Sequence, residues 1–134
     1  MVIFENGYFR LDYTLSTDIL GVDLPDMRTA GLSEAERCFE IMVEHVRNYN
    51  IHRLLLDSSK AVVEVGNAEY NQLIYQVSMD LMKTNLKKVA RIVSSTTELE
   101  KMAVKVQQAV LQSPSTYQIQ NFTSKQPASQ WLLV

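Results

Sequence analysis

The uninterrupted apolar run Leu54-Leu55-Leu56 constrains the fold of this chain more than any other feature of its sequence. Successive side chains of an extended strand point to opposite sides, so a strand built on this run is apolar on both faces. Such a strand must be covered on both faces, which is typical of a central strand in a parallel sheet. The mostly apolar stretch from Val89 to Ser94 predicts a second strand of the same kind.

The residues before this run predict antiparallel strands. Val2 to Glu5 is a short apolar start, and apolar and polar residues alternate in Tyr8 to Tyr13 and again in Ile19 to Leu24. This alternation is typical of half-buried strands. Ser16-Thr17-Asp18 predicts a turn between the last two strands, and Pro25 cannot donate to a strand ladder. We therefore expect a β-meander at the amino-terminal end.

Helical periodicity separates the later strands. Ser33 and Glu36 form a capping-box pattern, which predicts a helix that begins there and ends near residues 48–50. Further helices are expected over residues 68–84 and 97–112, and a short last helix carries Pro127 in its first turn. The predicted apolar stripe of the first helix comprises Ala35, Cys38, Phe39, Met42, Val43 and Val46.

The order of these elements predicts the fold class. A β-meander followed by α-β-α-β-α-β-α indicates an α/β domain with a mixed, mainly parallel sheet and helices packed on it. The chain has 134 residues, which fits one domain over residues 1–134.

Composition excludes several classes of protein. With Cys38 as the single cysteine, neither an intrachain disulfide nor a multi-thiolate metal site is expected. Thirteen basic residues stand against fifteen acidic ones, which is not the basic field of a nucleic-acid binder. No apolar run is long enough to span a membrane, and the first residues lack the pattern of a signal peptide, so we expect a cytoplasmic protein.

Three segments carry a family resemblance. LLLDSSK (Leu54–Lys60), KKVARIVSS (Lys87–Ser95) and QNFTSKQPASQWLL (Gln120–Leu133) resemble the STAS-like domains related to bacterial anti-sigma-factor antagonists, a group similar to the SEC14 (CRAL-TRIO) lipid-transfer domains. The resemblance implies a STAS-like fold and a regulatory or ligand-binding function. Phospho-switched members of the family carry serines where this chain has Gly66 and Asn67, so that switch is not expected at this position.

Two polar groups follow the predicted parallel strands. They are Asp57-Ser58-Ser59 and Ser94-Ser95-Thr96. Ligands of open α/β sheets bind at the carboxyl ends of the strands. The second group lies at a predicted helix amino terminus, which favours an anion, so it could hold a phosphate or accept a phosphoryl group. The alternative is that both are ordinary caps and turns, because Ser, Thr and Asp are common there.

The predicted helix over residues 68–84 has an unusual outer side. Tyr75, Met79 and Met82 form a second apolar stripe nearly opposite the core stripe. Methionine and tyrosine are typical of contact surfaces, so this stripe is a candidate homodimer or partner interface, or the wall of an apolar ligand cavity. The alternative is a set of scattered surface side chains.

No combination of residues indicates catalysis. His45 and His52 have no nearby carboxylate or cysteine at ligand spacing, and Cys38 lies on an apolar stripe. We therefore expect no metal, no cofactor and no enzyme activity, but a protein-interaction module that forms a homodimer or binds another protein. The alternatives are a carrier of a small apolar or lipid-like ligand, favoured by the apolar loop Ala61–Val65, and a switch phosphorylated at Ser58, Ser59 or Ser95.

Overall fold

The computed structural model describes residues 1–5, 9–24, 27–59, 68–93 and 117–134 of the chain. The helix expected over residues 97–112 lies outside these described residues, as does the apolar loop Ala61–Val65.

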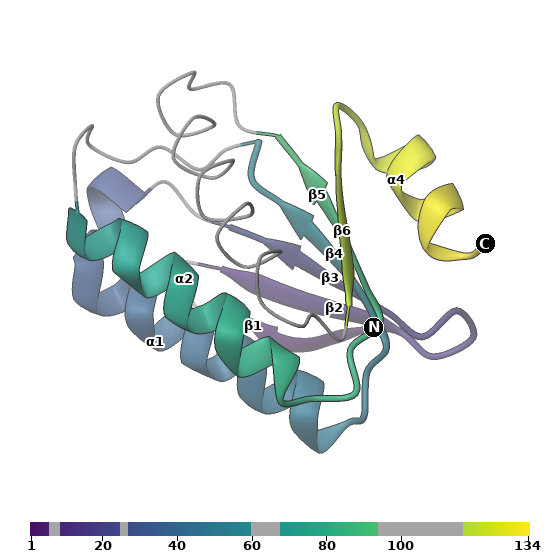
Figure 1. Ribbon diagram of the computed structural model, residues 1–134, viewed down its shortest axis with the longest axis horizontal. Coiled ribbons are helices and arrows are strands. Elements are labelled where there is room, and N and C mark those ends of the chain that lie inside the picture. The colour runs from purple at the N-terminus through teal and green to yellow at the C-terminus, as the bar shows by residue number, and fades with distance from the viewer. Residues whose placement is uncertain (6–8, 25–26, 60–67, 94–116) are drawn as a thin grey trace.

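The described strands form one mixed sheet in the order in which they follow along the chain (Figure 1). They are β1 (Val2–Glu5), β2 (Arg10–Thr14), β3 (Ile19–Asp23), β4 (Arg53–Asp57), β5 (Lys88–Ile92) and β6 (Gln118–Phe122). The first three strands pair antiparallel, and β3 to β6 pair parallel. The predicted meander and the mainly parallel sheet are therefore confirmed.

Helices cover the two faces of this sheet unequally. The helices α1 (Met27–Asn48) and α2 (Ala68–Met82) lie side by side on one face, and the short α4 (Lys125–Leu132) lies on the other (Figure 1). Contacts of α4 are with β4, β5 and β6. The outer face of β2 carries the polar residues Arg10, Asp12 and Thr14, and Asp12 accepts a hydrogen bond from the amino terminus at 2.8 Å. The chain is thus an α/β protein with helices on both faces of a mixed sheet.

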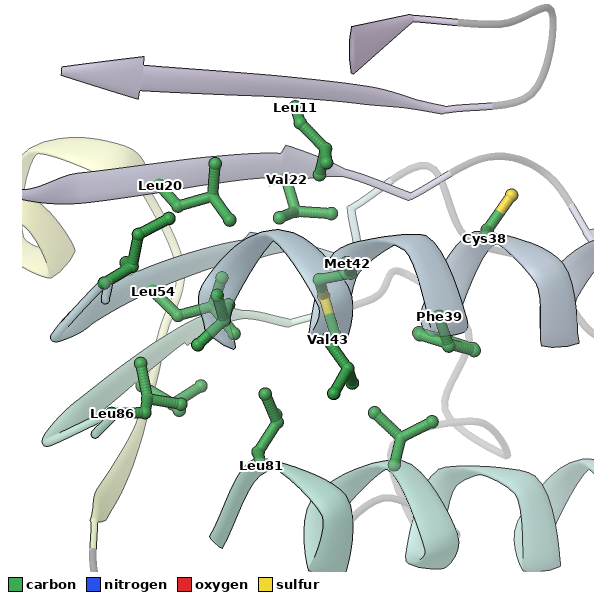
Figure 2. Packing of buried hydrophobic residues seen from close by; sticks show 14 of the residues in the cluster. Leu11, Leu20, Val22, Cys38, Phe39, Met42, Val43, Leu54, Leu81 and Leu86 are labelled. Carbon is green, nitrogen blue, oxygen red and sulfur yellow. The ribbon is translucent and has the colours of Figure 1, made fainter. Parts of the chain in front are cut away.

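The main core fills the space between the sheet and the helices α1 and α2 (Figure 2). The whole predicted stripe of α1 is buried, including Cys38 and Phe39. Leu11, Leu20 and Leu54 meet it from three adjacent strands and are fully buried. Burying a side chain of this size stabilises the fold by about 2 kcal/mol, so this layer is the larger source of stability.

A second, smaller core lies under α4. It comprises Ile19, Ala90, Ile92, Ala128 and Leu132, with Leu55, Phe122 and Trp131 partly buried against it. Leu54 faces the main core and Leu55 faces this one, so β4 is covered on both faces as its apolar run predicts. The predicted burial of Ala128 and Leu132 is confirmed, whereas Trp131 is only half-buried.

The predicted start of the first helix is wrong. The helix α1 begins at Met27, so Ser33 lies inside it and is exposed, and Glu36 is not in its first turn. Residues three apart are neighbours on any helix surface, so the capping-box pattern also fits a helix interior. Gly31, which the predicted start at Ser33 leaves outside the helix, also lies within α1. A glycine inside a helix costs only about 1 kcal/mol, which the buried stripe of α1 outweighs.

Candidate functional site

Two aspartates stand side by side at the carboxyl edge of the parallel strands. Asp23 is the last residue of β3 and Asp57 the last of β4, and the two are paired in register. Strand alternation puts Asp57 on the same face as Leu55 and Asp23 on the same face as Ile19, which is the face that α4 covers. The register therefore brings two carboxylates to one corner of the molecule.

Lys125 provides the opposite charge at this corner. It is the first residue of α4, and its Nζ lies 3.6 Å from Oδ2 of Asp57 and 3.7 Å from Oδ1 of Asp23. A cation in the first turn of a helix opposes the helix dipole, and this turn holds no acidic residue. The two aspartates provide the compensating negative charge. We call Asp23, Asp57, Ser59 and Lys125 the carboxyl-edge site.

Ser59 holds one oxygen of Asp57. Its backbone N–H and its hydroxyl both donate to Oδ1 of Asp57, at 2.9 Å and 2.6 Å. Asp57 is also tied to the sheet through its backbone, because its carbonyl accepts a hydrogen bond from Leu24 N–H at 3.0 Å. The carboxylate therefore projects from a well-anchored position.

The environment keeps Asp57 ionised. Burial alone would raise its pKa, since only 15% of the side chain is exposed. The hydrogen bonds from Ser59 and the charge of Lys125 together outweigh burial, and the pKa of Asp57 lies below its ordinary value. A largely buried anion is thus held beside a cation at neutral pH.

Two of the three described polar residues predicted for this edge belong to the corner. Asp57 and Ser59 take part in the carboxyl-edge site, whereas Ser58 is 2% exposed and donates its N–H to the carbonyl of Ile92 at 3.0 Å. Ser94, Ser95 and Thr96 lie outside the described residues. A serine buried as deeply as Ser58 is not accessible to a modifying enzyme, while Ser59 is exposed.

The sequence prediction missed Asp23 and Lys125. A signal for each was present, because Asp23 ends an apolar strand as Asp57 does, and Lys125 lies where a helix dipole disfavours a cation. Neither signal says that the two residues meet, since they are far apart along the chain.

The predicted α2 surface is only partly exposed. Tyr75 is 38% exposed, and Met79 is half-buried one turn further along the helix. Met82 is also half-buried and packs against the main core. Tyr75 and Met79 therefore form the accessible part of this stripe, which we call the α2 surface.

A network at the opposite end of the strands joins His52 to a carboxylate. Asp18 accepts a hydrogen bond from the Tyr13 hydroxyl at 2.7 Å and lies 2.5 Å from Nδ1 of His52. The expectation that His52 has no nearby carboxylate is wrong, because the fold brings Asp18 to it from the β2–β3 turn. His45 instead donates from its ring to the carbonyl of Ile41 at 2.8 Å and stacks on Tyr49.

Other candidate chemistry finds little support in the described part of the chain. Burial raises the pKa of the Cys38 thiol to about 11, so it is not a nucleophile at neutral pH. The described residues contain no group of three or more metal-ligating side chains.

A groove of about 360 Å³ lies between α1 and α2. It is lined mainly by charged residues, namely Glu40, Val43, Glu44, Arg47, Asp80, Lys83 and Thr84. Its charges do not suit an apolar ligand.

Comparison of the chain with protein-family models, with curated proteins and with solved structures finds no match. Among the described helices, none combines the length and the apolar character needed to cross a membrane. Over its described residues the chain is an α/β protein with a six-stranded mixed sheet and a polar corner at the carboxyl edge of that sheet.

Proposed function

We propose that this chain is a cytoplasmic regulatory module without enzyme activity, which acts by binding a second protein molecule through the α2 surface. The preferred partner is a second copy of the same chain, which gives a two-fold symmetric homodimer.

The observation that carries the proposal is the position of Tyr75 and Met79. The opposite side of α2 places Val77 and Leu81 in the main core, so the helix has no need of large apolar residues on its outer side. Tyrosine buries a large area at little cost in conformational entropy, and the flexible side chain of methionine adapts to the shape of a partner. Both residues are enriched where protein surfaces meet.

We further propose that the module is STAS-like. The support is the order of elements, a meander followed by alternating helices and parallel strands, together with the three segments that carry the resemblance. Carriage of an apolar ligand is the weaker alternative, because the groove between α1 and α2 is lined mainly by charged residues.

The test is the substitution Met79→Glu, followed by sedimentation of the full chain. A buried unpaired carboxylate would disrupt an interface, so we expect a dimer to become a folded monomer. The matched control is Gln130→Glu, which adds the same charge at an exposed position of α4 on the opposite face of the sheet and should leave the dimer intact. A wild-type chain that sediments as a monomer, or a Met79→Glu dimer, would refute self-association through the α2 surface.

A further inference from the structure

The two side chains of the α2 surface are too few to form a stable dimer by themselves. A specific interface buries about 800 Å² on each partner, whereas one fully buried aromatic side chain contributes about 150–250 Å². Tyr75 is only 38% exposed and Met79 is half-buried, so most of the area must come from neighbouring residues. The homodimer interface proposed above therefore has to extend onto an adjoining surface.

The groove between α1 and α2, which we call the α1–α2 groove, adjoins the α2 surface. Its lining residue Lys83 directly follows the last residue of α2. The backbone N–H of Lys83 donates to the carbonyl of Asp80 at 3.1 Å, which continues the turn of the helix. Lys83 therefore lies about one turn beyond Met79, since residues four apart are neighbours on a helix surface. A partner that covers Met79 also reaches the groove.

Four exposed charges of this groove have no ion pair in the part of the chain that the structure describes. They are Glu40, Glu44, Arg47 and Lys83. Asp80, the fifth charged lining residue, already accepts a hydrogen bond from Gln76 at 2.9 Å. The four unpaired charges comprise two acids and two bases, so they are balanced in sign and accessible to another molecule.

The acids and the bases occupy opposite ends of the α1–α2 groove. Each of the two helices connects a pair of parallel strands, so both run from the carboxyl edge of the sheet to its amino edge (Figure 1). Along this common direction, Glu40 and Glu44 precede Arg47 on α1. Lys83 follows the end of α2. The basic end of the groove therefore lies nearer the amino edge of the sheet.

We propose that the α1–α2 groove is the second part of the homodimer interface and that the same groove of a second copy packs on it. A two-fold axis perpendicular to the helices reverses their direction in the partner, so the acidic end of each groove faces the basic end of the other. A two-fold axis parallel to the helices would place like charges together, which is unfavourable. The inference rests on the homodimer proposed above and specifies its geometry.

The test uses two charge-reversed variants of the full chain, Glu40→Lys/Glu44→Lys and Arg47→Glu/Lys83→Glu. Each variant alone carries like charges along the groove, so we expect its homodimer to dissociate at protein concentrations at least about tenfold higher than the wild type does. An equimolar mixture restores opposite charges across the interface and should sediment as a heterodimer with about the wild-type affinity. A variant with all four substitutions should form a homodimer again, because its acidic and basic ends have only changed places.

The control is Glu5→Lys, which reverses an exposed charge on the edge strand β1 and should dimerise as the wild type does. Circular dichroism confirms that each variant is folded. If Met79→Glu is a monomer while both charge-reversed variants remain dimers of wild-type affinity, the α2 surface stands and the groove contact is overturned. If the two variants are monomers and their mixture is too, the grooves do not face each other. A wild-type monomer overturns both proposals.

Discussion

At the scale of the residue, Asp18 shows how a single side chain holds distant strands together. Its φ of 54° lies in the left-handed region, which costs a non-glycine residue about 1 kcal/mol. The conformation directs its carboxylate to the hydroxyl of Tyr13 and to the ring and backbone N–H of His52. Arg53 adds a hydrogen bond to the carbonyl of Thr17 at 2.6 Å. These hydrogen bonds connect the β2–β3 turn to the start of β4.

We expect Asp18→Ala to lower the free energy of unfolding by about 2 kcal/mol, since Tyr13 and His52 both lose a partner and alanine is no better suited to the left-handed region. Urea unfolding measures the loss. The control is Asp80→Ala on the surface of α2, where the carboxylate accepts only a hydrogen bond from Gln76 among the contacts described, and where we expect a change below about 0.5 kcal/mol. Equal losses in the two variants would contradict a structural role for the Asp18 network.

At the scale of the element, α1 is defined by its buried stripe and by how it ends. Asn50 has a φ of 53°, and Ile51 N–H donates to the carbonyl of Val46 at 3.0 Å. Asparagine tolerates the left-handed conformation that commonly ends a helix, so the predicted end near residues 48–50 is confirmed. The predicted start at Ser33 is wrong, because this residue lies inside the helix.

The substitution Ser33→Ala discriminates between a cap and a helix interior. Loss of a capping serine costs about 1 kcal/mol, whereas alanine in an exposed helix interior is the better helix former. We expect the free energy of unfolding to stay the same or to rise by up to about 0.5 kcal/mol. Thermal unfolding followed by circular dichroism makes the comparison, and a clear decrease in stability would favour the capping box.

The short helix α4 owes its position to a few side chains. It has only eight residues, and its preceding residue Ser124 makes no side-chain capping hydrogen bond. Isolated helices of this length are unstable in water, so packing on the sheet must hold it. Lys88 also donates to the carbonyls of Trp131 and Val134, at 3.1 Å and 2.7 Å.

Adjacent leucines at the end of α4 provide a matched pair. Leu132 is fully buried and Leu133 is 51% exposed. We expect Leu132→Ala to cost about 3 kcal/mol and Leu133→Ala less than about 0.5 kcal/mol in urea unfolding. If the two variants were equally stable, α4 would not be packed on the sheet as described.

At the scale of the whole molecule, one sheet separates two cores. Cys38 belongs to the main core, and Trp131 packs against the core under α4. The strand β4 contributes to both, through Leu54 on one face and Leu55 on the other. Loss of either core would expose one face of this central strand, so we expect the two to unfold together as one domain.

The prediction can be checked with two intrinsic probes in one denaturant series. The Cys38 thiol, buried and with its pKa raised to about 11, should react with a thiol reagent only when the main core opens. Trp131 emission follows the core under α4. A single domain requires coincident midpoints, and a tryptophan transition that precedes thiol reactivity would show that α4 unfolds separately.

Residues that are close along the chain were sufficient to predict most described elements. The alternation in Ile19 to Leu24, the stripe of α1 and the run Leu54 to Leu56 each follow from the need to bury apolar side chains at the period of a strand or a helix. Asp57 and Ser59 could be placed in one site for the same reason, because two residues of one turn are always neighbours.

Contacts between distant segments could not be predicted in this way. Asp23 meets Asp57 because β3 and β4 pair in register, and Lys125 reaches both because α4 packs on the same face. His52 meets Asp18 because the β2–β3 turn lies against the start of β4. Each contact depends on which strands are neighbours and on their register, and these follow from burial of the two cores in the folded sheet rather than from any local pattern.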